Sequence, residues 1–261
     1  MGDTYIFDTS SDLGGQHMTL LESVLDPTTT AFLGELDIRP GQRCLDLGAG
    51  GGSITRWLAE RTGPQGTVVA VDKDVNHLVE QPGVEVVAHD VTEGLPVDGP
   101  FDLIHARLLL VHLPDREVVF KGLIDALAPG GWLVLGDISG RPLDVVAAPS
   151  PAAARLFDRM QRLSHEVLAP VQGIDLGWAE SVDDRMVTAG LVDVDSMEWS
   201  RTTAGGTAGC LLHANLNEQA APLLREAGAS DVELQHYRNL MRDPAFRAWF
   251  YRVVTVRGRR R

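Results

Sequence analysis

Apolar and polar positions in the first half of the chain alternate between two periods. Short β-branched runs, typical of buried strands, are separated by stretches with the 3.6-residue period of an amphipathic helix. This order predicts a parallel sheet built from strand–helix–strand units. The expected strands, each bounded by Gly, Pro or Asp, cover residues 44–47, 67–72, 84–88, 101–105 and 132–137.

Two helices are expected before the first strand, over residues 16–25 and from Asp26 to about residue 36. Asp26 followed by Pro27 has the form of an N-cap with proline in the first turn, which predicts a break between them. After the second strand, Asp74 is expected to cap a further helix. After the fourth strand, Pro114 is expected to open a helix that runs to residue 127.

The strand–helix rhythm breaks after residue 138. A Pro/Ala-rich loop over 141–152 leads to an expected helix over 153–168, which indicates an insertion. The rest of the chain predicts a strand over 192–199, a turn at Gly205 and Gly206, two helices, and a last strand over 249–256. Ser230 with Glu233 three residues later is the signature of a capped helix start.

Composition narrows the class of protein. The chain has 261 residues, 44% of them apolar, with a formal net charge of -13 and a pI of about 5.0. A negative surface repels polyphosphate, so nucleic acid is a poor candidate partner, and the arginine-rich end at residues 257–261 is expected to be a solvated terminus. The chain has no long apolar run, an acidic start, and only Cys44 and Cys210. These features predict a cytoplasmic protein with no membrane span, disulfide framework or metal site.

The most informative segment is CLDLGAGGGSIT, residues 44–55, in which an apolar strand runs into a glycine-rich turn and a helix. Glycines at the carboxyl end of a parallel strand let a ligand approach the backbone closely. A dinucleotide fingerprint reading from Gly48 needs Gly or Ala where Ser53 stands, so that pattern is incomplete. The spacing is instead Asp46-x-Gly48-x-Gly50-x-Gly52. A carboxylate here suits a cationic ligand better than a pyrophosphate.

This spacing resembles motif I of the class I S-adenosylmethionine-dependent methyltransferases, in particular the small-molecule methyltransferases of bacterial specialised metabolism. The resemblance covers about residues 40–140 and implies an α/β fold: a Rossmann-like, seven-stranded, mostly parallel sheet with helices on both faces. It also implies an N-terminal helical lid and helical insertions around strand six. The implied parts are a lid at 1–40, a cofactor-binding core at 41–140, insertions forming an acceptor pocket at 141–190 and 200–248, and last core strands at 191–199 and 249–256.

The same resemblance implies which residues contact the cofactor. Asp72, at the end of the second strand, is placed to accept hydrogen bonds from ribose hydroxyls, a feature shared with NAD enzymes. The segment after the third strand resembles the adenine-binding segment, with an acid and the next amide meeting the base. The full expected set is Asp46, Gly48, Gly50, Gly52, Asp72, Lys73, Asp90, Val91, His105, Ala106 and, from the lid, Gln16. We expect His89 to be a surface residue.

Methyl transfer needs alignment more than acid–base chemistry, so a base is optional. The candidate bases are His17, His105, His112 and His165, and His112 is preferred because it stands in the HLPD-like element beside the cofactor segment. The candidate walls of an acceptor pocket are Phe157, Met160, Trp178, Phe246 and Trp249, for which core packing is the competing role.

The sequence therefore predicts an enzyme that moves a methyl group from S-adenosylmethionine to an O, N or C atom of a small molecule. Two alternatives stay open: an NAD(P)-dependent oxidoreductase, and a protein that binds S-adenosylmethionine without methylating. No nucleic-acid or membrane partner is expected, and a homodimer is the default oligomer.

Overall fold

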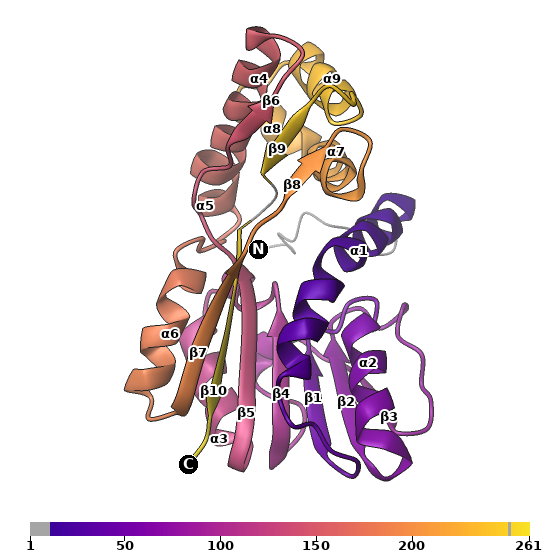
Figure 1. Ribbon diagram of the computed structural model, residues 1–261, viewed down its shortest axis with the longest axis vertical. Helices are drawn as coiled ribbons and strands as arrows, with labels where there is room; N and C mark the ends of the chain where they lie inside the picture. Colours follow the sequence, from indigo (N-terminus) through magenta and orange to yellow (C-terminus); the bar gives the residue numbers. More distant parts are fainter. Residues whose placement is uncertain (1–10, 250–251) are drawn as a thin grey trace. The chain divides into compact units, whose positions relative to one another are not determined.

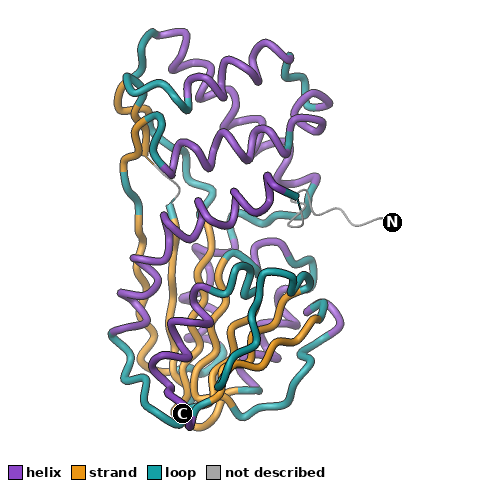
Figure 2. The backbone as a smooth tube through the Cα atoms, turned by 90° about the vertical axis from the view of Figure 1, so that its right-hand side faces the viewer, coloured by secondary structure: helices purple, strands orange, loops and turns teal. Residues whose placement is uncertain are grey.

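The computed structural model describes residues 11–249 and 252–261, and these residues form two compact units. The sheet unit consists of residues 26–139, 177–199 and 253–261, and the helical unit of residues 11–25, 140–176 and 200–252. Figure 2 shows that strands dominate the first and helices the second. Within the described residues no helix is both long and apolar enough to cross a bilayer.

The sheet unit contains, among residues 26–139, 177–199 and 253–261, a seven-stranded sheet of order β3-β2-β1-β4-β5-β10-β7 (Figure 1). β10 is antiparallel to both of its neighbours, and the pairings from β3 to β5 are parallel. Its elements are β1 (Arg43–Leu47), α2 (Ser53–Thr62), η1 (Gly63–Gln65), β2 (Thr67–Asp72), β3 (Val84–Ala88), η2 (Val91–Glu93), β4 (Phe101–Arg107), η3 (Leu110–His112), α3 (Arg116–Asp125), β5 (Leu127–Ile138), α6 (Trp178–Thr188), β7 (Val192–Trp199) and β10 (Val253–Arg259).

Helices cover both faces of this sheet, as the sequence predicts. Alternate residues of a strand point to opposite faces, so Leu45 and Leu47 of β1 pack in one cluster with α3 and α6. Cys44 packs in another cluster, with α2 and the second half of α1 (Asp12–Gly34). Two separate apolar cores therefore hold the central strands, which accounts for their unbroken burial.

Three strands have the predicted bounds: β2, β3 and β7. β4 is longer than predicted and ends at Arg107, and β5 begins at Leu127 because Leu127 pairs with Phe101 of β4. The same pairing ends the helix after Pro114 early, since α3 covers only Arg116–Asp125. The prediction that this helix reaches residue 127 is therefore wrong.

The two N-terminal helices expected from the Asp26-Pro27 pair are one continuous helix, α1, with Pro27 inside it. Asp26 does not act as an N-cap, because its Oδ1 accepts a hydrogen bond from Arg107 Nη2 at 2.9 Å. Arg107 Nη1 also donates to Thr29 Oγ1 at 2.9 Å. These bonds fix the second half of α1 to the end of β4. This tertiary contact outweighs the local preference of the Asp26-Pro27 pair for a helix boundary.

The helical unit contains α4 (Pro151–Arg162), a π-helical turn η4 (Leu163–Leu168), α5 (Ala169–Val171), α7 (Ala208–Gln219), α8 (Ala221–Glu226) and α9 (Asp231–Leu240). The chain also forms a small antiparallel sheet of order β6-β9-β8, from β6 (Val145–Ala147), β9 (Arg247–Trp249) and β8 (Thr202–Ala204). α9 starts with the predicted capping box of Ser230 and Glu233. Phe157, Tyr237 and Phe246 lie in the core of this unit.

Two boundaries differ from the sequence interpretation. The expected last strand over 249–256 is divided, because Trp249 pairs with Thr202 in the small sheet and the main-sheet strand β10 begins at Val253. The expected insertion over 141–190 is also too long. Its second half, α6, packs on β10 with Trp178, Val182 and Met186 in the main core, so it belongs to the sheet unit.

Candidate functional site

The glycine turn between β1 and α2 is the centre of the candidate site, and its glycines have different tasks. Gly48, Gly50 and Gly52 all have positive φ, at 72°, 55° and 74°, which side chains rarely adopt. A Cβ at Gly48 would lie 3.3 Å from the side chain of Leu109, whereas a Cβ at Gly50 would meet nothing within 4 Å. Of these three glycines, Gly50 is therefore the one beside open space that a ligand can fill.

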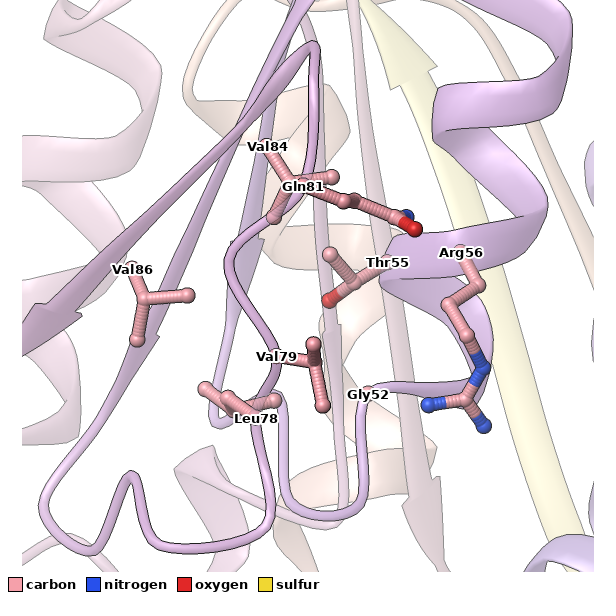
Figure 3. A pocket seen from close by; sticks show the side chains of 8 residues that line it. All are labelled: Gly52, Thr55, Arg56, Leu78, Val79, Gln81, Val84 and Val86. Atoms are coloured by element: carbon pink, nitrogen blue, oxygen red, sulfur yellow. The ribbon is translucent and has the colours of Figure 1, made fainter.

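Gly52 serves packing instead of ligand approach. A Cβ there would come within 2.8 Å of Leu78 Cδ2. Figure 3 shows Leu78 and Val79 beside a small hollow between α2 and β3. The segment joining β2 to β3 forms turns, and the helix expected after Asp74 is absent from residues 73–83. Asp74 Oδ1 instead accepts a hydrogen bond from the amide of Asn76 at 3.1 Å, in a local turn.

The second expected acid, Asp72, is attached directly to the glycine turn. Its Oδ2 accepts a hydrogen bond from the Gly50 amide at 2.8 Å, and its Oδ1 accepts one from the Asp74 amide at 3.1 Å. Burial raises the pKa of the Asp72 carboxyl, and the backbone amides of Gly50, Asp74 and Lys73 act against that rise. The structure thus places an acid and the open backbone of Gly50 side by side at the carboxyl edge of the sheet.

The first expected acid, Asp46, is buried below the turn and has protein partners on both oxygens. Oδ1 lies 2.8 Å from Nδ1 of His105 on β4, and Oδ2 accepts a hydrogen bond of 2.6 Å from the Thr55 hydroxyl on α2. Asp46, Thr55 and His105 are each no more than 3% exposed. The geometry favours Asp46 and His105 as residues that hold the turn in place rather than groups that touch a ligand.

The segment after β3, where Asp90 and Val91 are expected to meet the adenine, forms a capped 3-10 turn. Asp90 caps the 3-10 turn η2, where its Oδ1 accepts hydrogen bonds from the Thr92 amide and hydroxyl at 3.0 and 2.7 Å. These bonds, with a smaller contribution from Lys73, lower the pKa of Asp90. Lys73 Nζ lies 3.5 Å from Asp90 Oδ2, and Val91 is buried in the main core. Lys73 and Asp90 therefore link the ends of β2 and β3.

The carboxyl end of β4 lies further along the chain than predicted. His105 and Ala106 are inside the strand, where Ala106 is 2% exposed and packs in the main core. The turn begins at Leu108, which has φ of 54° although it is not glycine, and its amide donates to Gly136 O at 2.7 Å. Leu109, next in the chain, contacts Gly48 of the glycine turn. Leu108 and Leu109 are thus the residues at this edge that the sequence analysis missed.

A buried acid and an arginine hold the turn after β4 from two sides. Asp137 of β5 lies beside the amides of Leu109 and Val111, which lower the pKa of its carboxyl. Arg116 of α3 donates through Nε to Leu110 O at 3.1 Å. Asp137 is buried, and burial outweighs the amides and raises its pKa to about 8. The bond from Arg116 therefore holds the turn through a backbone carbonyl and does not depend on a side chain of the turn.

Comparison with known proteins shows the family to which this chain belongs. The family profile described as "Methyltransferase domain" matches residues 20–194, two thirds of the chain. This chain belongs to the methyltransferase-domain family. The match begins in α1 and ends in β7, so it includes the glycine turn, both acids bound near it and the turn after β4.

Curated relatives of this methyltransferase-domain chain carry methyltransferase names. Methyltransferase GfsG of Streptomyces halstedii is 36% identical over 156 residues, which are 54% of this chain and 55% of that protein. Phosphoethanolamine N-methyltransferase 3 of Arabidopsis thaliana is 31% identical over 168 residues, 60% of this chain and 33% of that protein. The chain thus spans about a third to just over half of the length of these relatives.

Solved structures share the fold at low identity. A phosphoethanolamine N-methyltransferase 2 of Haemonchus contortus in complex with S-adenosyl-L-methionine aligns with a TM-score of 0.60 and 16% identity, covering 100% of this chain and 60% of that one. The YcgJ protein of Bacillus subtilis aligns with a TM-score of 0.56 and 18% identity, covering 90% and 99%. These likenesses confirm the Rossmann-like methyltransferase fold predicted from the sequence.

Three of the four candidate histidines of this methyltransferase-domain chain are poorly suited to act as bases. Burial and the nearby Arg116 lower the pKa of His112 to about 4, and burial lowers that of His17 to about 4. Burial also lowers the pKa of His165. A general base works best with a pKa near the working pH, so a catalytic role for His112 stays a prediction without support from its surroundings.

The remaining expected residues lie in the helical unit or in a core. Gln16 is exposed on α1, where it lines a trough within the helical unit. Phe157, Met160 and Phe246 are at most 1% exposed in the core of that unit, and Trp178 is equally buried in the sheet unit. Trp249, at 38%, is the exposed member of the predicted pocket walls. Core packing therefore explains the other four.

Proposed function

We propose that this protein is an S-adenosylmethionine-dependent methyltransferase that acts on a small-molecule acceptor. The observation that carries the proposal is the pairing of Gly50 with Asp72: a left-handed glycine with open space in front of it, whose amide is bound by a partly buried carboxylate. A Cβ would fill that space, so the turn fits a ligand that needs bare backbone at this point.

The residues around this space fit the parts of S-adenosylmethionine. Asp72 would accept hydrogen bonds from the ribose hydroxyls, and Asp90 with the amide of Val91 would meet the adenine. Gly50 would admit the ligand to the backbone, while Asp46 and His105 keep the turn in shape. When bound, S-adenosylmethionine supplies a methyl group on a sulfonium that is already activated for in-line displacement. The chain's own task is to bind, to orient the acceptor and to exclude water.

This assignment of roles agrees with the pKa values of two candidate histidines. With pKa values of about 4, His17 and His112 are neutral at pH 7 and are weak bases. We infer that no histidine base is required, and that alignment of an acceptor that is nucleophilic by itself accounts for the rate. The acceptor atom, O, N or C, is left open by this arrangement.

Several observations support a small molecule as the acceptor. The net charge of -13 disfavours nucleic acid. Phosphoethanolamine, a small molecule, appears in the names of several relatives. The family match gives no support to an NAD(P)-dependent oxidoreductase. We propose that the helical unit, with the start of α1 as its lid, receives the acceptor.

The expected homodimer is a separate prediction, which sedimentation equilibrium would test.

The proposal is tested by calorimetric titration of S-adenosylmethionine into the wild type and Asp72→Ala. Loss of a buried polar partner costs roughly 1–3 kcal/mol, so the dissociation constant should rise about 5–150-fold. Asp74→Ala is the matched control, because it removes a neighbouring acid that does not bind Gly50, and it should bind as the wild type does. Equal affinity of Asp72→Ala and wild type, or no binding by the wild type, would refute the site.

A further inference from the structure

A carboxylate and a histidine lie buried together beneath the glycine turn. Asp46 of β1 and His105 of β4 stand opposite each other in the sheet, with Asp46 Oδ1 2.8 Å from His105 Nδ1. The Thr55 hydroxyl donates to the second carboxylate oxygen, Oδ2, at 2.6 Å. Both oxygens of Asp46 therefore have protein partners, and Asp46 precedes Gly48, the first glycine of the turn, by two residues.

A histidine at this position of the sheet is not explained by the hydrogen bond alone. Its neighbours in β4, Leu103, Ile104 and Ala106, are buried and apolar, and His105 is itself 3% exposed. An amide or a hydroxyl side chain could also donate to Asp46, without the cost of burying a ring that can become charged. Histidine adds a proton whose presence depends on its surroundings, because it is the side chain that changes charge between pH 5 and 8.

The proton of His105 decides the charge below the turn. With a neutral ring the Asp46–His105 pair carries one negative charge, and with a protonated ring it carries none. Water and salt screen this charge little, since the side chains of Asp46 and His105 are 2% and 3% exposed. The pair can therefore change the electrostatic potential at Gly48 and Gly50 without touching a ligand.

The other ionisable groups that the neighbouring elements bring to this pair keep their charge near neutral pH. From β1, Cys44 stays a neutral thiol, because burial raises its pKa to about 12. Arg107 of β4 is paired with Asp26 of α1, and Arg56 of α2 is exposed and donates to a backbone carbonyl of the glycine turn. At the same register β5 presents Val134, which is apolar. Among these groups the histidine is the one whose charge can vary.

We propose that His105 is a specificity-determining residue, which through its proton sets the preference of the site for S-adenosylmethionine over S-adenosylhomocysteine. This inference rests on the proposed function, because that function supplies the two ligands. S-adenosylmethionine carries a positive sulfonium, whereas the sulfur of S-adenosylhomocysteine is uncharged. The negative form of the pair favours the cation, so binding of S-adenosylmethionine expels the proton of His105 to solvent, and binding of the product lets the proton return. Replacement of product by fresh cofactor is therefore favoured at higher pH.

The test is calorimetric titration of each ligand into the wild type and His105→Asn, between pH 5 and pH 8, in two buffers of different ionisation enthalpy. The two buffers together give the number of protons released per ligand bound. The wild type should release more protons with S-adenosylmethionine than with S-adenosylhomocysteine, by up to about one proton. Its preference for S-adenosylmethionine should rise roughly three- to tenfold from pH 5 to pH 8. Both effects should vanish in His105→Asn, whose amide can donate to Asp46 but cannot titrate.

His236→Asn, at an exposed position of α9, is the matched control and should behave as the wild type does. Asp72, whose pKa is raised by burial, and the amino groups of the ligands also titrate, but they are common to all variants and cancel in the comparison. Melting temperatures show whether His105→Asn is folded. If it is not, the ring-nitrogen chemical shifts of His105 in the wild type, near pH 6, should show a more neutral ring with S-adenosylmethionine than with S-adenosylhomocysteine.

The outcomes separate this inference from the proposed function. Equal proton release by the wild type and His105→Asn, or equal ring shifts in the two complexes, would overturn the inference and leave the proposed function in place. A preference that stays constant with pH in the wild type would have the same meaning. Absence of binding of either ligand by the wild type would overturn both.

Discussion

The two units bury polar side chains in different ways. In the sheet unit, an acid at a strand end accepts a hydrogen bond from a backbone amide of the neighbouring turn, as Asp72 does from Gly50. In the helical unit, three buried polar residues stand in the middle of one helix, α7, at His213, Asn215 and Asn217. The first arrangement holds a turn through its backbone, and the second joins helices to one another.

The difference teaches where each unit tolerates change. A turn held through its backbone keeps its shape when its side chains vary, but it fails when the backbone itself is forced to move. A helix held through side-chain amides behaves in the opposite way, since the loss of one amide leaves buried partners without a hydrogen bond. The following predictions test this contrast, from the largest expected effect to the smallest.

Gly50→Val should have the largest effect, on binding. Valine disfavours a φ of 55° and would place its methyl groups in the open space beside Asp72. We expect the affinity for S-adenosylmethionine to fall by about 100-fold or more, close to 3 kcal/mol, in calorimetric titration. Gly41→Val is the control: Gly41 also has positive φ and open space, but it lies in the turn before β1. Similar losses of affinity in both variants would mean that strain alone is responsible.

Asn215→Leu should reduce stability rather than cofactor affinity. The change leaves Leu13 O and the Gln219 amide without their partner, which costs roughly 1–3 kcal/mol in the free energy of unfolding. Asn239→Leu, at an exposed position on α9, is the control and should stay within about 0.5 kcal/mol of wild type. Urea titration followed by circular dichroism measures both. A neutral Asn215→Leu would show that the amide does not hold α1 and α7 together.

At pH 5, Asp137→Asn should have the smallest effect of these changes, and the growth of that effect with pH is the diagnostic. The folded pKa of about 8 lies above the ordinary value of 3.8, so the stability that this group contributes is present at low pH and is lost as pH rises toward 8. Asparagine has nearly the same shape as aspartate, but it cannot ionise. The charged and polar groups around the site, Arg116 and Trp178, are unchanged.

The melting temperature of Asp137→Asn minus that of wild type should therefore increase from pH 5 to pH 8. Each kcal/mol of unfolding free energy that the wild type loses over this range should raise the difference by about 2–4 °C. The buried histidines, whose lowered pKa values act in the opposite direction at acid pH, are common to both proteins and cancel in the difference. A difference that is constant with pH would contradict the raised pKa of Asp137.

The sheet unit was largely predictable because its signals are local. Gly, Pro and Asp mark where β2 and β3 begin and end and where β7 begins, and a glycine turn after a strand needs no distant partner to be recognised. The end of β4 was missed because the apolar run from Leu108 to Val111 contains no such mark. Its boundary depends on pairing with β5, which continues to Arg107 and Gly136.

The helical unit was less predictable because its structure depends on contacts between distant segments. The division of the last strand at Trp249 depends on pairing with Thr202. α7 has buried polar residues on several sides and so lacks the apolar stripe that would reveal its neighbours. The trough beside it could not be expected from any motif.

The left-handed backbone of Leu108 has a consequence for the evolution of this turn. A glycine there would relieve the conformational penalty that a leucine pays at φ of 54°. It would also give the unfolded chain more freedom, and let the folded turn visit other shapes. Retaining a side chain at this position exchanges some thermal robustness for a single fixed route from β4 to Leu109, the residue that abuts the glycine turn.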